Sequence, residues 1–445
     1  VLSLLHQKAK VLKAQNPALA IQAYQDAESF LEKWFTTLKT NSRAELENMY
    51  YGIYEGLIDC LLKTGQIEEA FLFSDKSHAG ALTVNLSTPP LNLTHLQKSL
   101  APGTAMVEYF WGEEQVFAFL IKKEGITSFS IPISDSLYER TKRLYRNLSL
   151  RPKLRVTLEE TVSDARFLFE TILRPLYSSL PERCIIVPSG LLHLVPFEAL
   201  LIADPVNYNE VKDFAFIVHE KILSYSPSAS FWLAARQYQE VISTGKCYAF
   251  MPVFIGDPRP GVSLLPNSRD EISGISKVCR FEVFQNGAAS KAKFLEVYTN
   301  ARVLHLSTHA AADPSNRDNS NIVFYYHGAG RSEVTVADLL KLKSQAEMVV
   351  LSACETNLAQ IYRAEGAWSL ARAFLHGGSS SVITTLWKAD DPSSAKLMTD
   401  FYNFLKAGKD KGEALTLAKR KYLLDTATGS FEGYPYYWSI FVVLG

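Results

Sequence analysis

The sequence predicts an α/β protein with a mainly parallel sheet flanked by helices, preceded by an all-helical region. Three patterns support this prediction. Residues 1–98 repeat apolar side chains at helical spacing, residues 104–132 alternate apolar and polar side chains with turn residues at Gly112 and Gly125, and from about residue 248 short β-rich runs alternate with amphipathic helices. Because the last pattern is typical of a sheet covered by helices on both faces, we expect most strands there to be parallel.

The composition excludes several classes of protein. Lys and Arg number 46, as do Asp and Glu, so no basic surface for nucleic acid or an anionic membrane is predicted. No apolar run approaches the roughly 18–20 residues that cross a bilayer. The chain begins at Val1 without methionine or a signal peptide, so we expect a piece of something longer. The cysteine pattern indicates a reducing compartment such as the cytoplasm. The cysteines are five and dispersed, with no metal-like or disulfide-like spacing: Cys60, Cys184, Cys247, Cys279 and Cys354.

Residues 1–98 are expected to form packed helical pairs. Pro17 stands where a helix begins, and Ala20 and Leu31 fall on one face of it. In the second pair, Gly65 is predicted to form the turn. Small residues where such helices touch resemble tetratricopeptide repeats. The two units are too far apart for the standard period, so an ordinary helical hairpin remains the alternative.

Two further parts follow the helical region. Residues 99–247 start after a proline-rich connector and contain the alternating segment, a helical stretch and the short strand "CIIVPSG". Residues 248–445 contain the alternation of strands and helices, with Thr335 and Asp338 as a capping box at one helix start. We therefore expect domain boundaries near residues 98 and 247.

Two predicted parallel strands end in reactive side chains. "RVLHLSTH" ends in His309 and "EMVVLSAC" ends in Cys354, 45 residues later (354 − 309 = 45), with one helix between them. A right-handed crossover would join these strands and place both side chains at the carboxyl edge of one sheet. Ligands of open α/β sheets bind at that edge. The sequence therefore predicts a Cys–His site there.

The pair fits nucleophilic catalysis. A thiolate is the attacking species, so Cys354 needs an adjacent imidazole to remove its proton, and His309 can later return that proton to the leaving amine. Taken singly, a cysteine at a strand end is usually a small buried residue and a histidine after an apolar strand usually a core residue. The order and interval of the pair favour the catalytic interpretation. We predict structural or surface roles for four other histidines of the module: His193, His305, His327 and His376.

No phosphate loop, dinucleotide fingerprint, HExxH or GxSxG motif is present, which disfavours a nucleotide-binding signalling ATPase, and we predict no metal or organic cofactor. Instead, several segments resemble the CHAT family of caspase-like domains associated with tetratricopeptide repeats, over roughly residues 104–445. They are "IIVPSGLLHLVPFEAL", "LPNSRDEI", "LHLSTHA", "VVLSACETN", "EGAWSLARAFLHGGSSSVITTLWKADDPSSAKLMTDFY" and the terminal "YPYYWSIFVVLG".

This resemblance implies a relative of caspases and separase, with a caspase-like parallel or mixed sheet in two parts. Residues 99–247 would be the non-catalytic half and residues 248–445 the catalytic half of a cysteine endopeptidase with Cys354 and His309 as its dyad. The repeats would bind a regulatory protein or effector complex, and members often act in bacterial or antiviral defence. The alternative is an inert caspase-like scaffold that binds proteins through the repeats.

The resemblance also assigns residues around the dyad. Backbone amides of Ala310 and Cys354 would hold the oxyanion, although the family usually has glycine where this chain has Ala310. Asn357 also replaces a common glycine, a mild change because asparagine tolerates a left-handed backbone. Ser307 and Glu355 flank the dyad and are candidates for orienting it.

Substrate contacts are expected from the strand "VITTLWKADD". By the same resemblance, Thr385, Leu386 and Trp387 would pair with the substrate backbone, and Trp387 would offer an apolar wall. Asp390 or Asp391 would line the primary specificity pocket and favour a basic residue before the cut. Asp391 has a second interpretation as a helix N-cap, worth about 1 kcal/mol and without any effect on specificity.

Overall fold

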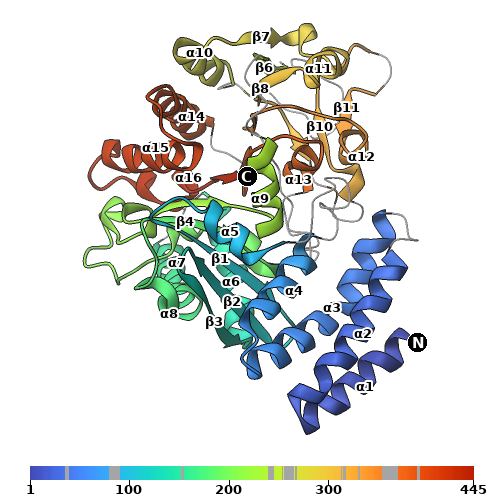
Figure 1. Ribbon diagram of the computed structural model, residues 1–445. Coiled ribbons are helices and arrows are strands. Elements are labelled where there is room, and N and C mark those ends of the chain that lie inside the picture. The colour runs from blue at the N-terminus through green and yellow to red at the C-terminus, as the bar shows by residue number, and fades with distance from the viewer. Residues whose placement is uncertain are drawn as a thin grey trace.

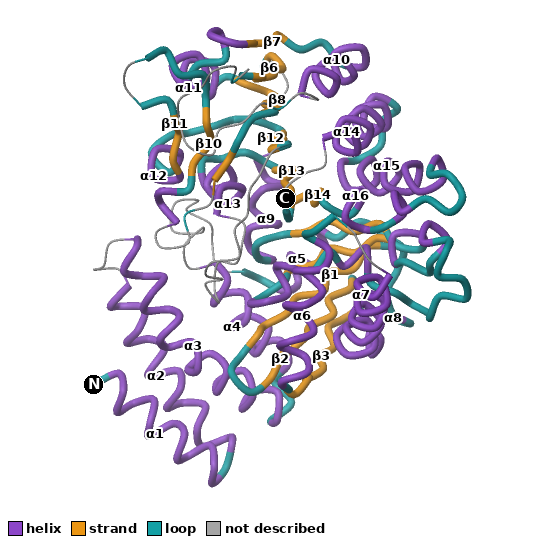
Figure 2. The backbone as a smooth tube through the Cα atoms, turned by 180° about the vertical axis from the view of Figure 1, so that it is seen from behind, coloured by secondary structure: helices purple, strands orange, loops and turns teal. Residues whose placement is uncertain are grey.

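The computed structural model describes residues 1–35, 40–79, 91–151, 155–238, 245–252, 254, 265, 268–311, 313, 317–328, 331–352, 369–387 and 391–445. The first helices form a stack at one end of the molecule, beside the first strands (Figure 1). The strands of the C-terminal half lie at the opposite end, and the C-terminus lies between the two groups of strands (Figures 1 and 2).

The N-terminal region is helical, as predicted, and its form is consistent with tetratricopeptide-like repeats. Pro17 is the first residue of its helix, and Gly65 forms the predicted turn with φ of +81°. Gly56 lets two helices approach closely, because a Cβ there would lie 2.2 Å from the Tyr24 ring. No described helix has an apolar stretch long enough to span a bilayer. The helices are α1 (Leu2–Gln15), α2 (Pro17–Phe35), α3 (Thr40–Lys63), α4 (Ile67–Ala79) and α5 (Leu93–Ser99).

Among the described residues, eleven strands form one sheet in the order β3-β2-β1-β4-β5-β14-β13-β12-β8-β6-β7. The alternating segment is the predicted antiparallel meander, and the strands from β6 to β13 in this sheet pair in parallel. A separate sheet has the order β11-β10-β9. The strands are β1 (Thr104–Trp111), β2 (Gln115–Lys122), β3 (Gly125–Pro132), β4 (Arg183–Val187), β5 (Ile222–Tyr225), β6 (Lys246–Met251), β7 (Glu282–Gln285), β8 (Ala301–Leu306), β9 (Ala310–Ala311), β10 (Asn321–Val323), β11 (Glu333–Thr335), β12 (Met348–Leu351), β13 (Val382–Thr385) and β14 (Phe441–Leu444).

Strand β14 joins the two groups of strands into one sheet. It pairs antiparallel with β13 over four residue pairs, from Val382 with Leu444 to Thr385 with Phe441. On its other side it runs parallel to β5, where Leu444 pairs with Tyr225. The sheet is therefore mixed, and its continuity depends on the last of the described strands.

Helices cover both faces of the sheet. In the C-terminal half, α10, α14 and α15 lie on one side and α11 to α13 on the other (Figure 1). The capping box predicted at Thr335 and Asp338 is present at the start of α12. The remaining helices are α6 (Asp135–Leu148), α7 (Arg155–Leu168), α8 (Arg174–Tyr177), α9 (Ala229–Tyr238), α10 (Ser268–Val278), α11 (Lys291–Tyr298), α12 (Val336–Leu339), α13 (Ser369–His376), α14 (Asp391–Lys406), α15 (Lys411–Asp425) and α16 (Pro435–Trp438).

The helical region is packed directly on the sheet. Alternate residues of β1, including Met106 and Phe110, belong to the same apolar core as α2 to α4, whereas their neighbours face the opposite core. The Tyr51 ring of α3 stacks on Phe110 with centroids 4.5 Å apart. The Glu55 carboxylate accepts three backbone N–H groups from residues 113–115 of the β1–β2 turn, at 2.7, 2.8 and 3.0 Å. The repeats thus form a layer of the fold.

Buried titratable side chains lie in this interface. Ser74 donates a hydrogen bond to Glu108 at 2.6 Å, and Asp75 accepts the backbone N–H of Ser230 at 3.0 Å. Burial raises the pKa of Asp75 from 3.8 to about 6 and holds the pKa of Glu108 well above its ordinary value. Burial lowers the pKa of His78 from 6.5 to about 4. The acids and the histidine therefore make the stability of the fold depend on pH in opposite directions.

We predict that Asp75→Asn makes the protein more sensitive to acid. Stability from His78 is lost as pH falls from about 6.5 to 4, because the unfolded histidine binds a proton first. Stability from Asp75 changes the other way, since it is complete below about pH 4 and lost as pH rises to about 6. Removing Asp75 takes away one of the two buried acids that oppose the histidine effect, a contribution of up to about 3 kcal/mol, while Glu108 remains.

Denaturant midpoints between pH 4.5 and 7 measure this difference. The exposed carboxylate of Asp26 on α2 provides the control, because Asp26→Asn is expected to keep the wild-type dependence of the midpoint on pH. If the midpoint of Asp75→Asn depended on pH as the wild-type midpoint does, the raised pKa of Asp75 would be contradicted.

Candidate active site

Strands β8 and β12 lie side by side and end at the same edge of the sheet. They pair in parallel from Met348 with Val303 to Leu351 with Leu306, as the predicted crossover requires. The ladder continues one residue further, where the Ser352 N–H donates to the carbonyl oxygen of Leu306 at 3.1 Å. Cys354, Glu355 and Asp390 lie outside the described residues.

His309 leaves this edge directly after β8. Its side chain is 7% exposed, and its ring centroid lies 5.2 Å from that of Phe254. Its carbonyl oxygen accepts the backbone N–H of Val323 at 2.9 Å, and the neighbouring Thr308 hydroxyl donates to the Val323 carbonyl. Ala310 follows as the first residue of β9, paired with Ile322 of β10. The small sheet therefore fixes the backbone on both sides of the histidine.

A buried carboxylate ties the two strand ends together. Glu271 of α10 is 4% exposed and accepts the Ser307 hydroxyl through Oε2 at 2.8 Å. Its other oxygen, Oε1, accepts the Ser352 hydroxyl at 2.5 Å. Ser307 lies two residues before His309, and Ser352 lies two residues before Cys354. One side chain therefore sets the spacing of the segments that carry the predicted dyad.

His305 lies beside this network and has no access to solvent. Its side chain is fully buried, as predicted, and Nδ1 lies 3.2 Å from the Tyr402 hydroxyl of α14. Nε2 lies 3.2 Å from Oε1 of Glu271, outside hydrogen-bonding geometry. His305 is thus a core residue. The structural role predicted for His193 also agrees with its position, since it is buried with Nδ1 3.0 Å from the Gly190 carbonyl.

Glu271 was not predicted as a site residue. It stands in the quoted segment "LPNSRDEI", 38 residues before His309 (309 − 271 = 38), where nothing local connects it with the dyad. The sequence nevertheless contains a signal for such a residue. Each strand is followed by a serine, one further residue and then the reactive side chain, as "STH" and "SAC". Two buried serine hydroxyls on adjacent strands each need a hydrogen-bond acceptor, and one carboxylate between them can serve both. Glu271 is that acceptor.

The residues predicted to meet substrate lie at the end of β13. Both backbone polar groups of Leu386 are hydrogen-bonded within the protein. Its N–H donates to the Ile440 carbonyl at 2.9 Å, and its own carbonyl accepts the Tyr145 hydroxyl at 2.9 Å. Trp387 is 1% exposed, and its indole N–H donates to the Tyr436 carbonyl at 3.1 Å. The role of Trp387 as a substrate wall stays a prediction, and in this structure its ring lies in the core.

Two further assignments stay predictions. Thr385 is the last residue of β13 and pairs with Phe441 of β14, while its buried hydroxyl has no hydrogen-bond partner among the described residues. Helix α14 begins at Asp391 itself, one residue earlier than the N-cap assignment places it. In the described part of the chain, no group of three or more His, Cys, Asp or Glu side chains is placed to hold a metal ion.

The fold defines a caspase-like α/β protein. Chains in two crystal structures of the separase–securin complex of Saccharomyces cerevisiae match 96% and 97% of this chain with TM-scores of 0.55 and 0.56. Sequence identity is 11% and 10%, and 37% of each matched chain is covered. At this identity the likeness concerns the fold alone.

The chain belongs to the CHAT-domain family, because the CHAT domain model matches residues 162–445, more than half of its length. This confirms the family predicted from the motifs. Tetratricopeptide repeat protein 28 of Homo sapiens is 24% identical over 334 residues, which takes in 63% of this chain and 13% of that protein. The Mus musculus protein of the same name is 23% identical with the same coverage. The chain thus spans a small part of these relatives.

We predict that Ser307→Ala and Ser352→Ala are coupled in their effects on stability. Each substitution removes a hydroxyl that donates to the buried carboxylate and is expected to cost about 1–3 kcal/mol. Because both hydroxyls act on Glu271, the double variant should depart from the sum of the single variants by more than about 0.5 kcal/mol. Denaturant unfolding of the full chain measures the three values.

Ser149→Ala at the end of α6 is the control. Its hydroxyl donates to the Arg146 carbonyl and shares no hydrogen-bond partner with Ser307, so its effect should add to that of Ser307→Ala. Additive effects of Ser307→Ala and Ser352→Ala would rule out the shared acceptor.

Proposed function

We propose that this chain is a cysteine endopeptidase in which Cys354 is the nucleophile and His309 the acid and base. The observation that carries the proposal is the parallel pairing of β8 and β12, which brings the segments before both residues to one edge of the sheet. The shared carboxylate of Glu271 gives those segments a fixed spacing. Membership of the CHAT family and the separase-like fold support the same class of chemistry.

The proposed reaction has two stages. His309 takes the thiol proton of Cys354, and the thiolate attacks the carbonyl carbon of the substrate peptide bond. The amides of Cys354 and Ala310 stabilise the negative oxygen, and the histidine gives its proton to the departing amine. A water molecule, deprotonated by His309, then attacks the thioester. The acid product leaves and the proton returns to the sulfur.

Substrate recognition is proposed for the segment after β13. Thr385, Leu386 and Trp387 would run beside the substrate backbone, and Asp390 or Asp391 would favour a basic residue before the cut. Glu355 and Ser307 would help to orient the dyad. For Ser307, its hydrogen bond to Glu271 supplies the physical basis of that role. A peptide library that varies the residue before the cut tests the preference. A role in bacterial defence rests on the family resemblance alone.

We also propose that binding of a protein partner to the repeats regulates the site. The Tyr51 hydroxyl of α3 lies 3.0 Å from Ser189 Oγ, at the start of the 3₁₀ turn Gly190–Leu194. Within that turn, His193 Nε2 lies 3.4 Å from Nη2 of Arg372 in α13. Helix α13 follows Cys354 along the chain. A displacement of α3 would therefore act, through contiguous buried contacts, on the first described helix that follows the nucleophile in sequence.

We predict that Cys354→Ala and His309→Ala each lower peptide hydrolysis by at least about 1,000-fold, because either change removes part of one catalytic unit. The test measures kcat/KM on a library with basic or apolar residues before the cut, together with labelling of Cys354 by a thiol-reactive peptide probe. Cys279→Ala is the matched control, since Cys279 is a free, partly exposed thiol outside the candidate active site.

Equal hydrolysis and equal probe labelling of the wild type and Cys354→Ala would contradict the protease proposal. Retained partner binding together with no hydrolysis by any form would favour the inert scaffold.

We predict that Tyr51→Phe increases amide hydrogen exchange in residues 190–194 and 369–376. The substitution removes the hydroxyl contact with Ser189 but keeps the ring that stacks on Phe110. Tyr54→Phe is the control in the same helix, because that hydroxyl donates to Glu28 within the repeats. Mass spectrometry of exchange measures both variants, and a change confined to α3 would argue against the regulatory route.

A further inference from the structure

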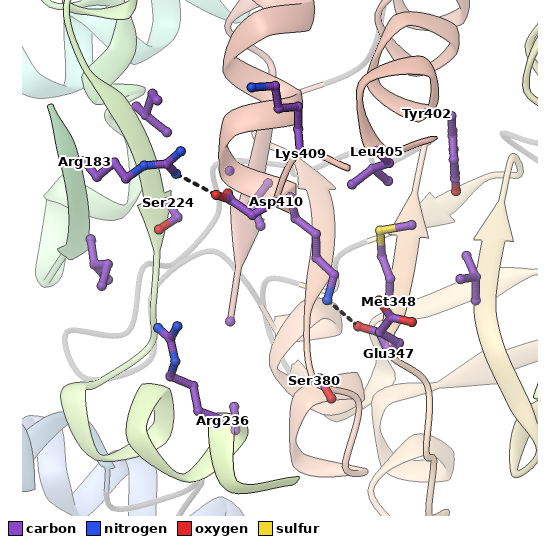
Figure 3. A pocket seen from close by; sticks show the side chains of 18 of the residues that line it. Arg183, Ser224, Arg236, Glu347, Met348, Ser380, Tyr402, Leu405, Lys409 and Asp410 are labelled. Atoms are coloured by element: carbon purple, nitrogen blue, oxygen red, sulfur yellow. Dashed lines mark hydrogen bonds and ion pairs between the residues drawn. The ribbon is translucent and has the colours of Figure 1, made fainter. Parts of the chain in front are cut away.

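A pocket of about 950 Å³ lies at the amino edge of the sheet, where Arg183 begins β4, Ile222 begins β5 and Met348 begins β12 (Figure 3). We call it the amino-edge pocket. The candidate active site lies at the opposite, carboxyl edge. Strand β8 alone separates the two edges by roughly 20 Å at about 3.3 Å per residue. The amino-edge pocket is therefore a separate feature.

Basic side chains outnumber acidic ones around the pocket. Two carboxylates line it, those of Glu347 and Asp410. The cations come from both halves of the chain, since two belong to the part before residue 247 and five to the part after it. They are Arg183, Arg236, Arg280, Arg302, Lys406, Lys409 and Lys411.

Only part of this charge is neutralised by neighbouring carboxylates. Arg183 pairs with Asp410 at 2.6 Å, as Figure 3 shows, and with Glu413 at 2.5 Å. Three other cations of the pocket, Arg236, Arg280 and Lys406, form no ion pair with the described residues. Arg236 instead lies over the Trp232 ring, 4.4 Å from its centroid, and burial lowers its pKa.

Two further cations are held inside the pocket wall. Lys411 donates to the carbonyl oxygen of Glu347 at 2.9 Å, and desolvation lowers its pKa. Arg302 donates through Nη2 to the sulfur of Cys247 at 3.4 Å. Its buried Nε has no hydrogen-bond partner in the described part of the chain. Both side chains keep donors available for an acceptor inside the pocket.

Convergent cations repel one another and lose hydration, which is unfavourable unless an anion accompanies them. Guanidinium groups match the geometry of phosphate oxygens, and lysine adds point charge. The volume lies at the upper end of the range for small-molecule sites. We propose that the amino-edge pocket binds a small multiply phosphorylated molecule that contacts both halves of the chain.

Titration calorimetry of the full chain with inorganic tripolyphosphate tests this proposal, in 150 mM salt to suppress weak surface binding. We expect one site per chain. Arg236→Gln combined with Arg280→Gln should weaken binding at least 10-fold, and these exposed positions are suited to substitution without unfolding. Lys411→Met should weaken it further. Lys142→Gln, on the basic face of α6, is the control and should leave affinity unchanged.

A chemical footprint gives a second measurement that does not depend on proteolysis. Cys247 and Cys279 are free, partly exposed thiols that line the pocket. Tripolyphosphate should slow their alkylation by iodoacetamide, measured at pH 9 because burial raises the pKa of Cys279. The Arg236→Gln/Arg280→Gln variant should lose this protection.

Absence of binding, equal weakening by Lys142→Gln, or unprotected thiols at saturating tripolyphosphate would overturn the proposal. Tighter binding of citrate than of tripolyphosphate would also overturn it, since the site would then select carboxylates. Loss of hydrolysis in Cys354→Ala leaves these measurements untouched, so the two proposals fail independently.

Discussion

The main-chain ladder of β14 is the interaction on which the rest of the structure depends. This strand supplies hydrogen bonds to β5 on one side and β13 on the other, so two groups of strands become one sheet. Its backbone also extends to Gly445, whose N–H donates to Tyr225 at 3.0 Å. Both proposed sites lie on this continuous sheet, and the relation between its two edges is fixed only while the ladder is intact.

At the carboxyl edge, a single carboxylate has a comparable organising role. Glu271 accepts hydrogen bonds from serine hydroxyls that follow two adjacent strands. The buried serines and His305 pack closely around it, which limits movement of either strand. A catalytic pair needs its groups held within a fraction of an ångström, which side chains on separate strands do not achieve unaided. The helix α10 thus contributes to the site without supplying a reacting atom.

Local patterns predicted the elements well. The meander, the capping box at Thr335, the adjacent strands β8 and β12 and the buried His305 all follow from periodicity and end signals. Long-range features escaped prediction because their partners are far apart in sequence: the place of β14, the packing of the repeats on β1, and Glu271. The position of Trp387 shows the same limit, since its ring meets the Tyr145 ring and its indole N–H donates to the Tyr436 carbonyl, both distant in sequence.

The order of β14 along the chain has a consequence for biosynthesis. Residues 441–444 follow the other described strands in sequence, yet they lie in the middle of the sheet. During translation, the earlier strands emerge from the ribosome with two exposed edges, at β5 and β13, that wait for this segment. Unpaired edges are prone to aggregation, and contacts between distant segments form slowly. A nascent chain would therefore acquire its joined sheet late, and any hydrolytic activity with it.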